Sequence, residues 1–260
     1  MRLVIHQNAN TMGGPSTNLS LFFVFIVIPV LLPGATATTF VFTNKCQETI
    51  YPGVVTGASS PAFPTTGFAL QPGADVAFVG VPAGWSGRIW GRRRCSTDAS
   101  GRFGCASGDC GTGQVQCNGA GNQAPSTLAE FTLNGDGGKD FYDISNVDGF
   151  NVPIQIQPYG YTPSCATVAC AADINAACPP ELAARAADGT TVGCRSACLA
   201  FDTDEFCCRG EYETPDRCKP SIYSEFFKQR CPQAYSYAYD DKSSTFTCAS
   251  GGHYQITFCP

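Results

Sequence analysis

The sixteen cysteines among 260 residues constrain this chain more than any other sequence feature. The count is even and far above ordinary usage, which indicates a disulfide framework formed in an oxidising compartment. Structural zinc prefers Cys-x-x-Cys motifs or cysteine–histidine sets, and no Cys-x-x-Cys occurs here, so we expect no metal site. If every cysteine is paired, none remains as a thiolate nucleophile. Spacing alone leaves the pairing open.

The first 37 residues have the features of a secretory signal peptide. Arg2 is the single ionised side chain among them, residues 19–32 form an apolar run, and Ala35-Thr36-Ala37 offers small residues for cleavage. The run is shorter than the roughly 20 residues that span a bilayer, so a retained membrane anchor is the less favoured alternative. We expect cleavage after Ala37 and release of the mature chain to the extracellular space.

The net charge and the last residues of the mature chain limit the classes of partner that we expect. Loss of the leader removes one arginine and no acid, which leaves a formal net charge of −6 against the −5 of the whole sequence. Nucleic acids and anionic membrane surfaces repel such a chain, so neither is expected to bind it. The sequence ends at Cys259-Pro260 without an apolar tail, so no stable membrane anchor is expected, and a monomer is the default.

Short apolar runs separated by glycine and proline predict a mainly β fold. Residues 39–44 (TFVFTN) and 75–82 (DVAFVGVP) are typical of strands joined by tight turns. A β-sandwich or barrel is the expected architecture, built from residues 38–92, 124–169 and 232–260. Further strands are predicted within residues 127–133, 140–145, 152–158, 234–239, 244–248 and 254–259.

Two cysteine-rich stretches interrupt the β pattern and predict separate lobes. Residues 93–123 are rich in glycine and poor in large apolar residues, which favours a small loop lobe closed by disulfides. Residues 170–231 carry the helix signals, in 171–187 and more clearly in 220–230, and so predict a helical, disulfide-rich lobe. In the second helix Ser221 is the expected cap, and the side chains Ile222, Phe226 and Phe227 are expected on one apolar stripe.

Few catalytic classes are compatible with this composition. His253 is the single histidine of the mature chain and lies in a Gly-rich turn, without a Gly-x-Ser-x-Gly motif elsewhere, which disfavours a serine–histidine–aspartate triad. No GxxxxGK[ST] motif occurs, so no nucleotide cofactor is expected, nor any other cofactor. Acid–base catalysis would therefore rest on carboxylates.

Residues 101–110 (GRFGCASGDC), followed by Cys117, closely resemble the signature of the thaumatin-like proteins, the plant defence group that includes osmotin and thaumatin. Ser107 stands where that signature usually has threonine. Blocks similar to those of the family follow in family order at residues 127–131, 140–145, 147–153 and 226–232. The resemblance covers the whole mature chain and implies the thaumatin-like β-sandwich with its two disulfide-rich lobes.

The resemblance also implies a disulfide pairing, carried over by cysteine order. Closure of long loops would restrict the unfolded chain, so we expect high resistance to heat and proteases. The implied pairs are Cys46–Cys259, Cys95–Cys105, Cys110–Cys117, Cys165–Cys248, Cys170–Cys231, Cys178–Cys194, Cys198–Cys207 and Cys208–Cys218.

A further implication is an acidic cleft between the β domain and the helical lobe, formed by one arginine, one glutamate and three aspartates. From the residues alone, most of these acids could be ordinary turn residues, whereas a glutamate inside a strand is unusual. The last aspartate is ambiguous by one position. The matching residues are Arg88, Glu130, Asp143, Asp148, and Asp240 or Asp241.

The implied function is a secreted, pathogenesis-related antifungal protein that binds fungal cell-wall β-1,3-glucan, released to the apoplast if the source is a plant. In a weak endo-β-1,3-glucanase version, Glu130 donates a proton to the leaving oxygen, Asp143 activates water or stabilises the oxocarbenium-like transition state, and Arg88 keeps Asp143 charged. The alternatives are a non-catalytic protein that binds or perturbs the pathogen surface and an inhibitor of microbial enzymes. Three aromatic residues could stack on sugar rings or belong to the core: Phe141, Tyr142 and Phe150.

Overall fold

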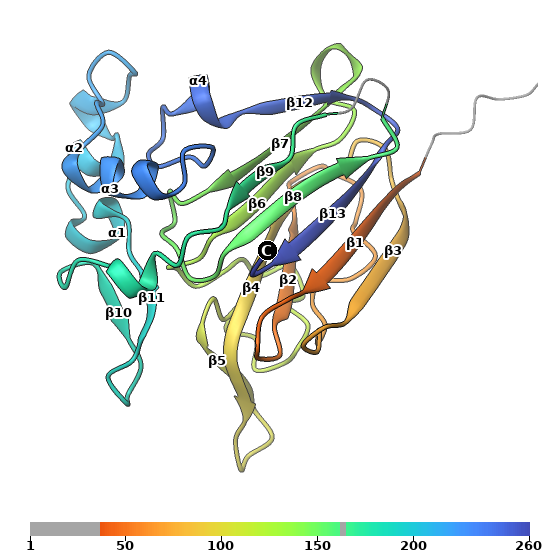
Figure 1. Ribbon diagram of the computed structural model, residues 1–260, viewed down its shortest axis with the longest axis horizontal. Coiled ribbons are helices and arrows are strands. Elements are labelled where there is room, and N and C mark those ends of the chain that lie inside the picture. The colour runs from red at the N-terminus through yellow and green to blue at the C-terminus, as the bar shows by residue number, and fades with distance from the viewer. Residues whose placement is uncertain (1–36, 162–164) are drawn as a thin grey trace, which may run out of the picture. The chain divides into compact units, whose positions relative to one another are not determined.

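A computed structural model describes residues 37–161 and 165–260. The expected signal peptide lies outside the described residues, apart from Ala37 itself. Two β-sheets form the body of the described chain (Figure 1). The five-stranded sheet has the order β3 (Asp75–Val81), β1 (Thr38–Asn44), β13 (His253–Phe258), β8 (Ile154–Tyr159) and β9 (Val168–Cys170). The six-stranded sheet has the order β12 (Phe246–Ala249), β7 (Lys139–Ser145), β6 (Leu128–Thr132), β4 (Ser86–Thr97) and β2 (Tyr51–Thr56), with β5 (Phe103–Ser107) paired to β4.

Aromatic side chains fill the space between the two sheets. Buried and half-buried residues alternate along β1, as expected for a strand with one face in the core. Phe40 of β1 contacts Phe131 of the other sheet, with ring centroids 5.0 Å apart, and Phe131 in turn contacts Tyr254 of β13 at 5.1 Å. These contacts across the layers make the fold a β-sandwich, the fold class that the sequence predicts.

The strands join distant parts of the chain. β13 pairs in parallel with β1, so the last strand completes the first sheet, as the sequence predicts. Eight disulfides join all sixteen cysteines, in the same pairs that the family resemblance implies. Cys46–Cys259 links the residues that follow the β1 and β13 strands.

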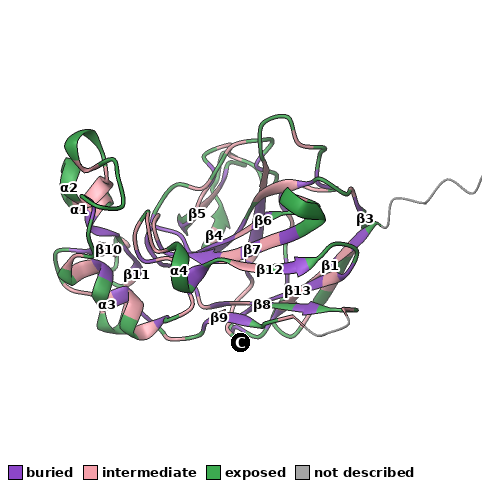
Figure 2. Cartoon of the chain, turned by 90° about the horizontal axis from the view of Figure 1, so that it is seen from above, coloured by how far each residue is buried: buried purple, intermediate pink, exposed green. Residues whose placement is uncertain are grey.

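The remaining elements belong to the cysteine-rich stretches, to the turn before β7 and to the segment before β12. Their residues are mostly exposed or half-buried (Figure 2). No helix within the described ranges is long and apolar enough to cross a membrane. The elements are β10 (Ala183–Arg185), β11 (Thr191–Cys194), α1 (Ala197–Phe201), α2 (Asp204–Cys207), α3 (Ile222–Arg230) and α4 (Asp241–Ser244), with single 3₁₀ turns at Asp136–Gly138, Asn175–Ala177 and Gly210–Tyr212.

The α3 helix begins where the sequence predicts. The Ser221 side chain accepts a hydrogen bond from the Ser224 backbone N–H at 3.1 Å, and the Ser224 side chain accepts one from the Ser221 N–H at 2.8 Å. This reciprocal capping box satisfies two backbone donors that a helix start leaves unpaired. The predicted apolar stripe is wrong in one position, since Phe227 is buried but Ile222 is 76% exposed.

Two other predicted elements are wrong. Residues 171–187 form a 3₁₀ turn and the short strand β10 instead of a helix, because Pro179 and Pro180 cannot continue a helix. Residues 234–239 form a turn with a single bridge between Ser145 and Tyr235 instead of a strand. There Asp240 accepts hydrogen bonds from the Ser236 backbone N–H and hydroxyl, which offers the backbone an alternative to a strand ladder.

Candidate functional site

Three charged residues lie in one row across the six-stranded sheet. Arg88 on β4 is directly opposite Glu130 on β6, and Glu130 is directly opposite Asp143 on β7. Their strand neighbours Ile89, Ala129 and Ile144 are fully buried, so the alternation of strand side chains places the charged row on the face away from the sandwich core. The row lines a cleft of about 790 Å³.

An ion pair joins the first two members of the row. Arg88 Nε lies 3.0 Å from Glu130 Oε1, and the side chains are 52% and 30% exposed. Burial raises the pKa of Glu130, the positive charge of Arg88 opposes that rise, and the charge of Asp148 adds to it. The ion pair therefore favours the ionised form of Glu130.

Asp143 has the more strongly perturbed carboxyl group. Burial, followed by the negative charge of Glu130, raises the pKa of Asp143 to about 8, with Arg88 opposing the rise. Its Oδ1 atom is buried and has no hydrogen-bond partner among the described residues. The interpretation that Arg88 keeps Asp143 charged is therefore wrong, because Glu130 lies between them in the row and takes the ion pair.

The structure shows which of the two candidate aspartates, Asp240 or Asp241, lies in the cleft. Asp241 lines the cleft together with Asp148. Asp240 instead forms an ion pair with Lys228, with Nζ and Oδ2 2.9 Å apart, and it does not line the cleft. The charge of Asp241 contributes to the raised pKa of Asp143, which places the two carboxyl groups within electrostatic reach of each other.

The aromatic residues named from the sequence divide in the same way. Phe141 lines the cleft and alternates with the buried Tyr142 along β7. Tyr142 and Phe150 are 1% and 0% exposed and belong to the core, so they offer no face to a sugar ring. Tyr235 lines the cleft as well. It could not be named from the sequence, because the strand-like pattern of residues 234–239 hides the turn that brings Tyr235 to the cleft.

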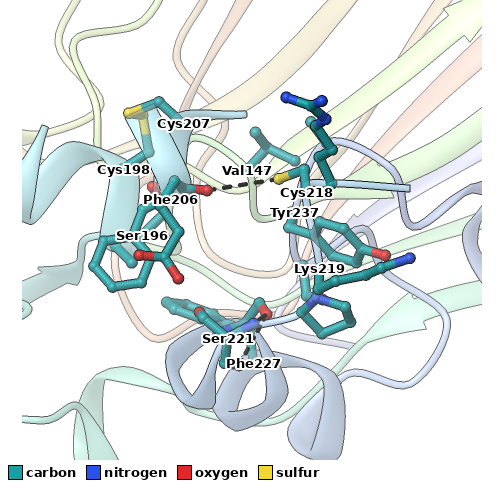
Figure 3. Close-up of a pocket in the computed structure, with 17 residues that line it drawn as sticks. Val147, Ser196, Cys198, Phe206, Cys207, Cys218, Lys219, Ser221, Phe227 and Tyr237 are labelled. Atoms are coloured by element: carbon teal, nitrogen blue, oxygen red, sulfur yellow. Dashed lines mark hydrogen bonds between the residues drawn. A yellow bond between two sulfur atoms is a disulfide. The ribbon is translucent and has the colours of Figure 1, made fainter. Parts of the chain in front are cut away.

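A smaller pocket of about 230 Å³ lies among α1, α2 and the start of α3 (Figure 3). Its buried hydroxyl groups already have partners within the protein, as in the Ser221–Ser224 capping box, where both side chains are bonded to each other's backbone. One acidic side chain, Glu205, lines it beside Arg217 and Lys219, so it lacks the facing pair of carboxyl groups that marks the cleft. Among the described residues no group of three or more histidine, cysteine or acidic side chains could hold a metal ion.

Comparisons with known proteins identify the family of this chain. The Thaumatin family matches residues 44–260. A thaumatin-like protein 1 of Pyrus pyrifolia is 54% identical over 227 residues, which cover 87% of this chain and 93% of that protein. A Prunus avium protein named glucan endo-1,3-beta-glucosidase is 51% identical over 227 residues, which cover 87% and 92%. A solved thaumatin-like xylanase inhibitor has a TM-score of 0.45 and 23% identity, and covers 85% of this chain and 99% of its own.

The fold, the eight disulfides and the matches to the family model and to the curated relatives define a thaumatin-type β-sandwich protein with an acidic cleft. This chain belongs to the thaumatin family.

Proposed function

We propose that this protein is a secreted antifungal defence protein that binds β-1,3-glucan in its acidic cleft and hydrolyses it slowly as an endo-glucanase. The observation that carries the proposal is the Glu130–Asp143 pair, two facing carboxyl groups of unequal proton affinity inside an open cleft. Glycoside hydrolysis uses such a pair, with one carboxylic acid and one carboxylate. The Prunus avium relative, at 51% identity, is named for hydrolysis of 1,3-β-glucan.

The electrostatics favour roles opposite to those expected from the sequence. Asp143, with its raised pKa, is the proton donor to the leaving glycosidic oxygen, and Glu130, ionised beside Arg88, is the carboxylate. Directly opposite residues on antiparallel strands are close enough for both carboxyl groups to reach one glycosidic bond. In the retaining version of the reaction, Glu130 would attack the anomeric carbon while Asp143 protonates the leaving oxygen. Water, deprotonated by Asp143, would then release the sugar and restore both groups.

The test measures hydrolysis and binding on the same samples. Mature protein, residues 38–260, is incubated with a soluble β-1,3-glucan, and new reducing ends are counted alongside calorimetric binding. Asp143→Asn and Glu130→Gln should each abolish the release of reducing ends. Asp75→Asn, which removes an exposed carboxylate of β3 outside the cleft, is the matched control and should release them at the parental rate.

Two results would contradict the proposal, the first in part and the second entirely. Glucan binding without release of reducing ends by the parent protein would make the cleft a recognition site and remove the enzymatic claim. Absence of both binding and release would leave the non-catalytic membrane-perturbing protein and the inhibitor of microbial enzymes as the remaining functions.

A further inference from the structure

Tyr235 is fixed beside the carboxyl pair through its backbone. Its N–H donates to the Ile144 carbonyl oxygen at 2.8 Å, and its own carbonyl oxygen accepts from the Asn146 N–H at 2.8 Å. Both partners follow Asp143 at the end of β7, so the position of Tyr235 is tied to the strand that carries Asp143. The half-buried side chain lines the cleft.

The hydroxyl group of Tyr235 connects this strand end to α4. It donates to Asp241 Oδ1 at 2.8 Å and also contacts Thr245 Oγ1. A phenol has one hydrogen, so when it donates to the Asp241 carboxylate it accepts from the Thr245 hydroxyl. Asp241 is exposed, and this hydrogen bond restrains a side chain that would otherwise move freely in water.

The segment that carries Tyr235 and Asp241 is also held from the helical side. Lys228 of α3 forms the ion pair with Asp240 and donates hydrogen bonds to the Ala234 carbonyl oxygen at 3.0 Å and to Ser244 Oγ at 2.8 Å. These contacts bracket Tyr235 and Asp241 in sequence. The geometry of this wall of the cleft is therefore set before any ligand binds.

We propose that Tyr235 is a positioning residue: its hydroxyl fixes the Asp241 carboxylate in the cleft wall as a hydrogen-bond acceptor for the sugar hydroxyls of β-1,3-glucan. The ligand part of this inference rests on the proposed function. Three charged groups of the same cleft act on the pKa of Asp143, namely Glu130 from β6, Arg88 from β4 and Asp241 from α4, and the charge of Asp143 in turn contributes to the raised pKa of Tyr235. Loss of the tether therefore affects both ligand affinity and the titration of Asp143.

A double-mutant cycle tests the route through Asp241. Tyr235→Phe keeps the ring and removes the hydroxyl, and Asp241→Asn removes the acceptor charge. Each should weaken binding of a soluble β-1,3-gluco-oligosaccharide by about 3- to 10-fold, the range of one hydrogen bond. The affinity of the double variant should be no lower than that of the single variant that binds less tightly, because the two groups act as one unit.

The matched control is Tyr239→Phe. Tyr239 belongs to the same segment but donates its hydroxyl to the Glu213 carbonyl oxygen, and it does not line the cleft. It should bind the oligosaccharide within about 2-fold of the parent protein. Losses that add in the double variant, or an equal loss in Tyr239→Phe, would overturn the assignment.

A second measurement needs no glucan. Carboxyl ¹³C NMR should show the titration midpoint of Asp143 about 0.3–1 pH unit lower in Tyr235→Phe than in the parent, because the untethered Asp241 charge moves into water. An unchanged midpoint would overturn the positioning role. If the parent protein fails to bind glucan, the proposed function is wrong, and the Asp143 midpoint alone decides whether Tyr235 positions Asp241.

Discussion

Glu130 and Asp143 face each other directly across the antiparallel strands β6 and β7. Like charges in this arrangement destabilise a sheet, so a pair of carboxyl groups there shares a proton unless a cation intervenes. Arg88 forms its ion pair with Glu130 and acts on Asp143 only through its more distant charge. The row Arg88–Glu130–Asp143 thus gives two acids of one cleft different proton affinities, and four predictions follow from this row and from the fold that supports it.

Removal of the cation should shift the pH dependence of the cleft. Arg88 opposes the raised pKa of both Glu130 and Asp143, so Arg88→Met should raise both pKa values. The acidic limb of glucan hydrolysis, which reports ionisation of Glu130, should move upward by about 0.5–1 pH unit, a modest shift because Arg88 is half exposed. The measurement is kcat/KM against pH. Arg185→Met, at an exposed arginine of β10, is the control, and the same limb position in the Arg88 variant would contradict the electrostatic role.

The raised pKa of Asp143 also predicts a pH-dependent stability. Below about pH 4 the carboxyl group is protonated in both folded and unfolded chains. Between about pH 4 and pH 8 the folded protein keeps the proton while the unfolded chain releases it, so this group lowers the free energy of unfolding as the pH rises. In the Asp143→Asn variant the side chain is neutral at every pH, so this fall in the free energy of unfolding is absent.

The variant should therefore be more stable than the parent by about 1–3 kcal/mol at pH 8 and about equal at pH 4. A pKa change from about 4 to about 8 carries roughly 5 kcal/mol, which solvent at the open cleft reduces. Denaturant unfolding of the disulfide-intact protein at pH 4, 6 and 8 measures the difference. A difference that does not grow with pH would show that Asp143 is ionised in the folded protein.

The sandwich can be predicted from the sequence because each strand, such as β1, alternates core-facing and outward-facing side chains. This alternation is visible in a short stretch of sequence, and packing of one face against the core preserves it. The prediction fails at residues 171–187 and 234–239, where Pro179-Pro180 and the contacts of Asp240 override the pattern. It names Arg88, Glu130 and Asp143 but assigns Arg88 to the wrong acid, because strand register depends on contacts between distant residues.

A buried acid outside the cleft should be important for stability. Asp140 is 1% exposed, and its carboxylate accepts hydrogen bonds from the Asn134 N–H and from the hydroxyls of Ser250, Tyr161 and Tyr254 at 2.8–3.0 Å. Asp140→Asn replaces one acceptor oxygen with a donor, so the two groups that donate to that oxygen lose their partner. The free energy of unfolding should fall by about 2–4 kcal/mol.

Thermal unfolding of this variant should be compared with that of Asp136→Asn, which changes an exposed acid in the preceding turn. The control should unfold at the temperature of the parent. Equal unfolding temperatures for Asp140→Asn and Asp136→Asn would mean that the two donors of the replaced oxygen find other partners.

The disulfides should differ in what they contribute, according to the loop that each closes. Cys46–Cys259 spans 213 residues and Cys208–Cys218 spans 10. In the chain-entropy model, removal of the long bridge lowers the free energy of unfolding by about 5 kcal/mol and removal of the short one by about 3 kcal/mol. The other disulfides inside the long loop already restrict the unfolded chain, so the difference between the two values should be smaller. The long bridge also holds the ends of the parallel pair β1 and β13 together, so its loss frees both strand ends.

Cys46→Ala/Cys259→Ala should therefore unfold at a lower temperature than Cys208→Ala/Cys218→Ala in calorimetry under non-reducing conditions. The reverse order would show that the helical region, and not the closure of the sandwich, limits the stability of this fold.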